Sequence, residues 1–442
     1  MNQTGVLDLG RFVQLIERVQ TCQLKGRISQ VIGLTMEATG PRLSLGELCY
    51  IQTNSADRQL VPSEVVGFKN NRILLMPLGD LEGIGPGSEL LATGTTLKVN
   101  VGMELRGRIL DGLGQPLDGK GRVFSGMTYP VMNNPPNPLT RKRITDPLPV
   151  GVRAIDGLTT VGRGQRMGFF AGSGVGKSTL IGMIARNTAA DINVIALIGE
   201  RGREVREFLE RDLGEAGLQR SVVVVATSDQ PALVRLKGAF VATSIAEYFR
   251  DQGLDVLFLM DSLTRFALAQ REVGLAIGEP PATRGFTPSV FALLPKLLER
   301  AGTSEKGSIT GLYTVLVEGD DMNEPITDAV RGIVDGHIVL NRNLAARNMY
   351  PAIDIGQSIS RVMIDIASRE QMEHAKRFRH ILATYEEARD LIDIGAYKQG
   401  SNSRIDEALT LIDQCHEFLR QDIYEEVHFE ETLEALGKSL RK

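Results

Sequence analysis

The chain has 442 residues, of which 42% are hydrophobic and 24% are charged, and its formal net charge is −4. This composition is typical of a folded globular protein, and it excludes a disordered chain and a global basic field that would attract nucleic acid. No apolar run approaches the ~20 residues of a transmembrane helix, and residues 1–20 lack the pattern of a secretory signal. Three widely spaced cysteines, and histidines without metal-ligand spacing, predict reduced thiols in a cytosolic protein and no zinc site.

Residues 1–24 contain a possible partner-binding helix. Phe12, Leu15, Ile16 and Val19 recur at helical spacing, which predicts a short amphipathic helix over residues 8–20. Such a stripe fits a helix packed on its own domain, and it also fits an arm that binds a partner. We favour the arm, because a chain terminus is often untethered.

Residues 25–97 have the pattern of an all-β domain. Apolar and polar residues alternate in GRISQVIGLTMEA, and Asn70-Asn71 separates two apolar runs, as in a β-hairpin. Several short strands over this length predict a small β-barrel. Within the next segment, residues 98–365, prolines cluster over residues 126–150 and indicate a connector that forms neither a helix nor a central strand.

Residues 151–345 alternate between strand-like and helical patterns. The strand-like segments are apolar and do not alternate, as expected for a mostly parallel sheet covered on both faces; they are GQRMGFFA, DINVIALIG, SVVVVAT, LDVLFLMD, TGLYTVLVEG and GHIVLN. Residues 366–442 have a helical pattern. We therefore expect an α/β domain over residues 98–365 and a helical domain after it.

The strongest motif is AGSGVGKST, residues 171–179, which lies between a strand-like and a helical pattern. This is the context of a P-loop, in which backbone N–H groups and a helix N-terminus surround phosphate. Lys177 is expected to contact the β- and γ-phosphates of ATP, and Ser178 to bind Mg²⁺. Ala171 replaces the usual first glycine. The expected nucleotide-binding residues are Gly172, Ser173, Gly174, Val175, Gly176, Lys177, Ser178 and Thr179.

Two carboxylates complete the predicted site. Asp261 ends the segment LDVLFLMD, at the sheet edge where ligands of α/β domains bind, and is the expected second Mg²⁺ ligand. Glu200 is the first carboxylate after DINVIALIG, and it could polarise a water molecule in line with the γ-phosphate. By the residues alone, a helix-capping role for Glu200 is an equal alternative.

Together these residues resemble the rotary and hexameric ATPases that include the catalytic subunits of ATP synthases. The resemblance covers residues 25–430 and rests on GRILDGLGQPLDGKG, the P-loop, GERGRE, LMDSLTRFA and YPAIDIGQSISR, in this order. The segments GEPPATRGFTPSVFALLPKLLERAG and EGDDMNEPITDAVRGIVDGHIVL are similar to the type III protein-export branch. Within this branch the chain most resembles flagellar export ATPases, and the ATPases of virulence-type injectisomes are the alternative.

The resemblance implies a fold and roles for three residues already singled out. The fold is a small β-barrel, an α/β RecA-like P-loop core and a C-terminal helical domain. Glu200 matches the family's catalytic glutamate, Arg201 a neighbouring arginine of the same site, and Asp261 the Walker-B carboxylate.

The same resemblance assigns three more residues. Arg265 matches an arginine near the phosphates, and Tyr350 the position where the family stacks an aromatic ring on adenine. Arg361 matches an arginine finger that reaches the γ-phosphate in the neighbouring subunit. The active site would then lie between protomers of a homohexameric ring.

The resemblance also implies partners and a location. The partners would be a stator-like dimer at the N-terminal helix, a coiled-coil stalk protein near residues 394–403, the export gate and chaperone–substrate complexes. The protein would be cytoplasmic and peripheral to the inner face of the cytoplasmic membrane.

Three other classes are disfavoured. A hexameric helicase would need aromatic or basic residues that residues 25–97 largely lack, so no nucleic acid is expected as a partner. A non-catalytic ring subunit would lack Glu200. A catalytic subunit of a rotary ATP synthase fits the core motifs but is less similar than the export ATPases.

Overall fold

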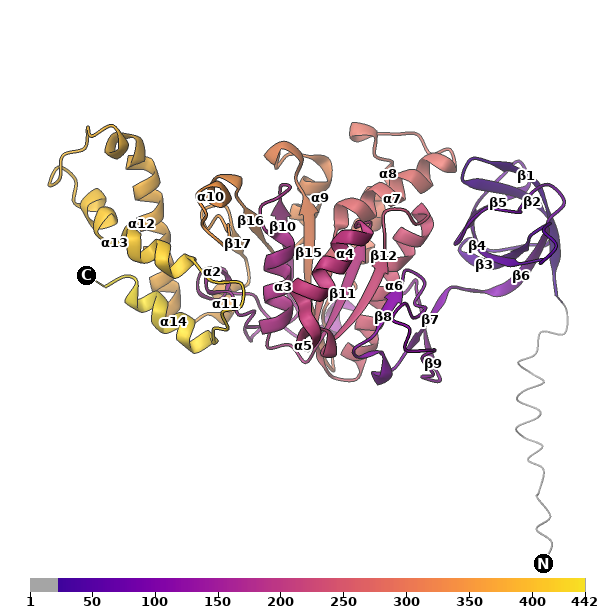
Figure 1. Ribbon diagram of the computed structural model, residues 1–442, viewed down its shortest axis with the longest axis horizontal. Coiled ribbons are helices and arrows are strands. Elements are labelled where there is room, and N and C mark those ends of the chain that lie inside the picture. The colour runs from indigo at the N-terminus through magenta and orange to yellow at the C-terminus, as the bar shows by residue number, and fades with distance from the viewer. Residues whose placement is uncertain (1–22, 442) are drawn as a thin grey trace, which may run out of the picture. The chain divides into compact units, whose positions relative to one another are not determined.

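The computed structural model describes residues 23–441, and the chain divides between Leu97 and Lys98 into two compact units (Figure 1). The predicted amphipathic segment, residues 8–20, lies outside the described residues. Within the described part of the chain, no helix combines the length and the apolar character needed to cross a membrane.

The first unit is a closed antiparallel barrel with the strand order β1-β2-β5-β4-β3-β6. Asn70 and Asn71 form the β4–β5 turn with φ values of 50° and 61°, a left-handed conformation that asparagine tolerates. The predictions of a hairpin and a small barrel are confirmed. The strands are β1 (Lys25–Ile32), β2 (Thr35–Thr39), β3 (Glu47–Gln52), β4 (Leu60–Lys69), β5 (Arg72–Pro77) and β6 (Glu89–Thr96).

The second unit is built on a sheet with the strand order β17-β16-β10-β15-β13-β11-β12-β8, parallel from β16 to β8. The six predicted strands are confirmed as β10 (Arg166–Ala171), β11 (Ile192–Ile198), β12 (Ser221–Ala226), β13 (Asp255–Asp261), β15 (Ser308–Leu316) and β16 (Gly336–Leu340). Three short strands lack a recognisable pattern and were not predicted: β8 (Ile109–Asp111), β14 (Gly302–Thr303) and β17 (Ile359–Ser360).

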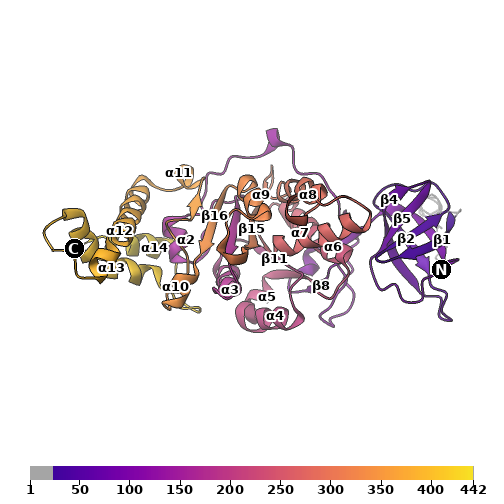
Figure 2. The same cartoon turned by 90° about the horizontal axis from the view of Figure 1, so that it is seen from above.

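Helices cover both faces of this sheet, which explains why its strands are apolar throughout (Figures 1 and 2). One face carries α3 (Lys177–Asn187), α4 (Gly202–Glu207), the π-helix η3 (Phe208–Leu213) and α5 (Gly214–Gln219). The other carries α6 (Ala232–Asp251), α7 (Leu263–Ala276), α8 (Pro288–Leu298) and α9 (Pro325–Ile333). Short 3₁₀ turns, η4 (Thr283–Gly285) and η5 (Glu318–Asp320), lie between these elements.

The C-terminal part is helical, as predicted, and belongs to the same compact unit as the sheet. Its apolar side chains continue the hydrophobic core of the α/β domain, with Phe378, Leu411, Phe418 and Leu436 among them. Its helices are α12 (Arg369–Asp393), α13 (Ser403–Leu419) and α14 (Phe429–Lys438), and they pack against α2 (Arg153–Leu158). Two short helices, α10 (Arg342–Ala346) and α11 (Met363–Ile366), precede them in the chain.

The proline-rich connector begins with a strand, β9 (Met127–Pro130), which pairs with β7 (Lys98–Val101) in a two-stranded ribbon. Between β7 and α2 the chain also forms two short 3₁₀ turns, η1 (Met103–Leu105) and η2 (Pro138–Thr140). A proline at the end of a two-stranded ribbon needs no backbone donor, so Pro130 is compatible with β9.

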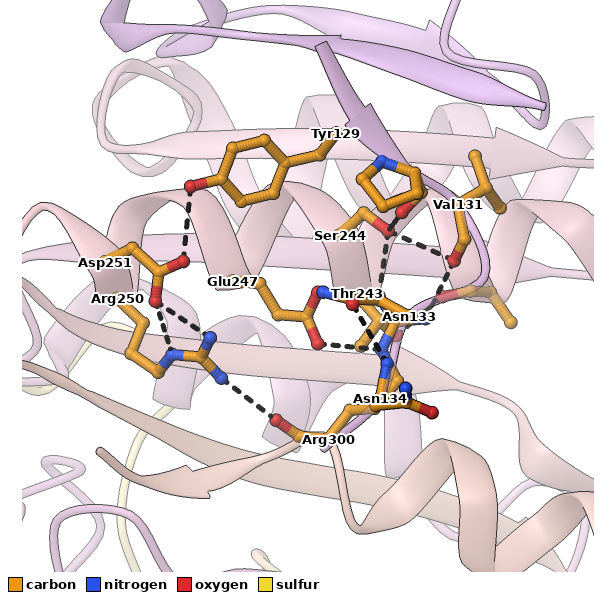
Figure 3. A network of polar contacts seen from close by, with 12 residues as sticks. Tyr129, Val131, Asn133, Asn134, Thr243, Ser244, Glu247, Arg250, Asp251 and Arg300 are labelled. Atoms are coloured by element: carbon orange, nitrogen blue, oxygen red, sulfur yellow. Dashed lines mark hydrogen bonds and ion pairs between the residues drawn. The ribbon is translucent and has the colours of Figure 1, made fainter. Parts of the chain in front are cut away.

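A buried ion pair fastens this connector to the α/β domain (Figure 3). Arg300 and Glu247 have side chains 1% and 0% exposed, and their two hydrogen bonds measure 2.8 and 2.7 Å. Arg300 also donates to the carbonyl oxygen of Val131, and Asn133 donates to Glu247 at 3.0 Å. The connector is thus held by charged groups that water does not reach.

We predict that Arg300→Leu lowers the free energy of unfolding by about 3–5 kcal/mol, because Glu247 would stay buried without its cation. The double variant Arg300→Leu/Glu247→Leu should lose less than the sum of the two single variants. Urea denaturation of all four proteins measures this coupling, and purely additive losses would contradict it.

Candidate active site

The P-loop connects the end of β10 to the start of α3, as predicted. Gly174 and Gly176 have φ values of 79° and 87°, which glycine adopts without the strain that other residues meet. A Cβ atom added to Gly174 would meet no protein atom within 4 Å. The loop therefore presents backbone to open space beside the N-terminus of α3, where backbone N–H groups favour an anion.

Three predicted residues meet at the carboxyl edge of the sheet, because β10, β13 and β11 all end there. Lys177 Nζ forms an ion pair with Asp261 Oδ1 and lies 4.0 Å from Glu200 Oε1. Asp261 is the last residue of β13, and Glu200 lies two residues beyond β11. The parallel register of the sheet thus places one ammonium group beside two carboxylates.

Glu200 is poised to accept a proton. Its Oε1 is buried without a hydrogen-bond partner among the described residues. Burial raises the pKa of Glu200 to about 7, with a further contribution from the negative charge of Asp261, and Lys177 opposes this shift. A hydrogen bond with Glu200 is the largest cause of the lowered pKa of Glu204. Capping of α4 does not explain Glu200, since the N-cap residue is Arg201.

The two predicted arginines near Glu200 differ in their surroundings. Arg265 packs under the loop after β11, where a Cβ on Gly199 would lie 2.8 Å from the Arg265 Cβ. Its Nε is buried and has no partner in the described part of the chain. The Arg201 side chain is 74% exposed and pairs with Glu204 at 3.3 Å, so it does not contact Lys177 or Asp261.

Tyr350 lies beside the P-loop, and its ring would be 3.5 Å from a Cβ placed on Gly176. Tyr350 is 41% exposed and lines a cavity of about 420 Å³ next to α3. An aromatic face at this place suits a planar base attached to a phosphate held by the P-loop.

Sequence reasoning missed a further part of the lining of this cavity, which Gln421, Asp422 and Ile423 form after α13. The Gln421 backbone N–H donates to the carbonyl oxygen of Tyr350 at 3.0 Å. The Gln421 side-chain amide donates to the carbonyl oxygen of Gly151 at 2.9 Å. These contacts join residues far apart in the chain, so no local motif identifies them.

Arg361 stands apart from the other predicted residues. It follows β17 and is exposed, and its backbone N–H donates to the carbonyl oxygen of Asp335 at 3.0 Å. Its guanidinium forms no ion pair or hydrogen bond with any residue between 23 and 441. The described residues therefore leave this cation unpaired.

The donor set fits Mg²⁺. The Asp261 carboxylate and the Ser178 hydroxyl, the first side chain after Lys177, offer the hard oxygen ligands that Mg²⁺ prefers, and Mg²⁺ also binds through substrate phosphates. The buried Glu200 oxygen without a partner is consistent with a site that is completed by ligand and water.

Three family models cover most of the chain. The ATP synthase alpha/beta family, nucleotide-binding domain, matches residues 151–360, and the beta-barrel domain of the same family matches residues 28–94. The T3SS EscN ATPase C-terminal domain matches residues 367–438.

Whole-length relatives agree with these models. The flagellum-specific ATP synthase of Bacillus subtilis is 55% identical, over 96% of this chain and 97% of that protein. The type 3 secretion system ATPase of Xanthomonas euvesicatoria is 52% identical, over 93% of both. The assembled ATPase EscN from the type III secretion system of enteropathogenic E. coli superimposes with a TM-score of 0.89 at 47% identity, covering 94% of this chain and 100% of that one. The chain therefore belongs to the ATP synthase alpha/beta family, in the branch of flagellum-specific and type III secretion ATPases.

Proposed function

We propose that this protein hydrolyses Mg-ATP to energise type III export of flagellar proteins at the cytoplasmic base of the secretion apparatus. The observation that carries the proposal is the meeting of Lys177, Asp261 and Glu200 at the end of a P-loop. The 55% identity to a flagellum-specific ATP synthase supports the flagellar assignment. The 52% identity to a type 3 secretion system ATPase keeps an injectisome as the alternative, which the neighbouring genes would decide.

Each site residue has a distinct role in this proposal. Residues 172–179 wrap the phosphates, Lys177 contacts the β- and γ-phosphates, and Ser178 and Asp261 hold Mg²⁺. The metal, when bound, neutralises charge that develops on the phosphate oxygens. Glu200 orients the attacking water molecule and accepts its proton.

The arginines and the tyrosine complete the proposed site. Arg265, with its buried Nε free, stabilises negative charge near the phosphates, and Arg201 acts through Glu204, which contacts Glu200. Tyr350 stacks on adenine in the 420 Å³ cavity. A π-face needs no hydrogen-bond code, so this contact provides affinity without reading the base edge.

We further propose that the active protein is a homohexamer in which Arg361 serves the site of the neighbouring protomer. The support is that the Arg361 guanidinium has no hydrogen-bond or ion-pair partner among residues 23–441, and a free guanidinium is well suited to a phosphoryl-transfer transition state. The related EscN has been described as an assembled ATPase.

Four partners belong to this proposal. EscN has been solved in complex with its central stalk EscO, and the loop between α12 and α13, where Ile394 is 75% exposed, is the proposed stalk contact here. Residues 1–24 would bind a stator-like dimer. The export gate and chaperone–substrate complexes would bring the protein to the inner face of the membrane.

Glu200→Gln should slow ATP hydrolysis about 10²- to 10⁴-fold and leave ATP binding intact, because the amide keeps the shape but cannot accept the proton. Single-turnover hydrolysis and a separate nucleotide-binding titration measure the two effects. Lys177→Ala serves as the control that loses turnover through the phosphate contact. Hydrolysis by Glu200→Gln at the wild-type rate would remove Glu200 from the mechanism.

The pH dependence of kcat/KM should report the raised pKa of Glu200 in the free enzyme. Because the base must be ionised, kcat/KM should fall about tenfold per pH unit on the acidic side of pH 7 and level off above it. ATP is also protonated below pH 7, and this affects kcat/KM in any variant. The residual activity of Glu200→Gln is therefore the control, and its kcat/KM should fall less steeply below pH 7 than that of the wild type. Identical profiles for both proteins would contradict the assignment.

Activity per protomer should climb with protein concentration, because the proposed finger comes from a second chain. Arg361→Ala should lower the rate about 10³- to 10⁵-fold at concentrations where the wild type is assembled. Arg369, which is also exposed but pairs within its own helix with Glu373, offers a matched control, and Arg369→Ala should leave the rate unchanged. A concentration-independent rate that Arg361→Ala does not alter would leave a P-loop ATPase whose protomers act alone.

A further inference from the structure

A buried hydroxyl group lies directly behind the predicted Mg²⁺ ligand. Thr314 is the only threonine in the segment GLYTVL at the end of β15, and it is 2% exposed. The sheet order places β15 between β10, which leads to the P-loop, and β13, which ends in Asp261. In register, Thr314 is opposite Phe169 on β10, and the preceding residue, Tyr313, is opposite Met260 on β13.

The Thr314 hydroxyl binds the carboxylate of Asp261. Its Oγ1 donates to Asp261 Oδ1 at 2.7 Å, and the carbonyl oxygen of Met260 is farther away at 3.2 Å. Lys177 Nζ contacts the same Oδ1. Among residues 23–441, all side-chain hydrogen bonds to Asp261 fall on this oxygen, so Oδ2 keeps its acceptor capacity for a ligand.

The surroundings of this hydrogen bond are apolar. Phe169, Ile181, Leu259 and Leu312 line the hollow beneath Thr314 and Asp261, and it has no room for a water molecule. A water molecule therefore cannot take over the contact if the hydroxyl is removed. A hydrogen bond to a charged group in such a place is stronger and more directional than one at the surface.

The two partners of Oδ1 differ in what happens when a nucleotide binds. In the proposed function, on which this inference rests, the ammonium group of Lys177 moves to the phosphates. Thr314 is anchored in a central strand and stays. It is then the group that continues to fix the orientation of the carboxylate.

We propose that Thr314 is a positioning residue for the magnesium–nucleotide complex. Its hydroxyl donates a hydrogen bond to Asp261 Oδ1, and this bond orients the carboxylate so that Oδ2 is available to bind Mg²⁺. The role is indirect, because Thr314 contacts neither nucleotide nor metal. Residues that orient a metal ligand in this way commonly change metal affinity by about 10- to 100-fold.

The test compares Mg²⁺-dependent nucleotide binding in the full chain, using a fluorescent ATP analogue and no measurement of hydrolysis. Thr314→Val should raise the Mg²⁺ concentration for half-maximal binding at least about tenfold, because it removes the hydroxyl and keeps the branched shape. Thr314→Ser should stay close to the wild type. Nucleotide binding in EDTA should be the same in all three proteins.

Thr310 provides the matched control, because it is 1% exposed and lies on the same strand and face as Thr314. Its hydroxyl accepts a hydrogen bond from the Gly164 N–H, which is outside the nucleotide site. Thr310→Val should not change the Mg²⁺ requirement. If Thr314→Val does not fold, as judged by thermal unfolding, Thr314→Ala provides the same comparison. An unchanged Mg²⁺ requirement in the hydroxyl-free variant, or an equal shift in Thr314→Ser, would overturn the inference. Absence of Mg²⁺-dependent binding by the wild type would overturn the proposed function itself.

Discussion

The charge of one ammonium group organises the site. Lys177 pairs with Asp261 and lies 4.0 Å from Glu200, so its positive charge offsets the repulsion between the two carboxylates and opposes the rise in the Glu200 pKa. The two acids are nonetheless unequal, because Asp261 has a direct ion pair and a hydroxyl donor, whereas the buried Glu200 Oε1 accepts no hydrogen bond from the described residues. In the proposed mechanism, that inequality distinguishes Asp261 as the metal ligand from Glu200 as the general base.

The parallel sheet is what makes this cluster possible. Strands β13 and β11 are neighbours in the sheet, and β15 separates them from β10, yet all of these strands end at the same edge. A ligand at this edge meets the helix N-terminus of α3 and the two carboxylates together. The intervening strand is therefore well placed to support the site from behind, which is where Thr314 lies.

Local sequence signals predicted the elements and the residues at their ends. The P-loop, Asp261 and Glu200 could be found because strand ends and glycine-rich turns leave a pattern within about ten residues. Gln421 and Arg300 could not, since each matters through contacts with segments more than a hundred residues away, such as Gly151 and Val131. Thr314 lies in a predicted strand, but an isolated threonine there is indistinguishable from an ordinary β-former until the neighbouring strand is known.

One helix connects the two ends of the proposed nucleotide site. The N-terminus of α3 forms the phosphate loop, and near its C-terminus Arg186 donates to the carbonyl oxygens of Ile423 and Asp212. Ile423 lines the same cavity as Tyr350, and Asp212 lies in η3, which continues the helix that begins just after Glu200. Through these contacts α3, whose residues 180–185 are buried, joins the phosphate loop to the cavity wall at Ile423 and to the helical segment that follows Glu200. A nucleotide that fills the cavity and the P-loop together would consequently be aligned with Glu200 by the packing of a single element.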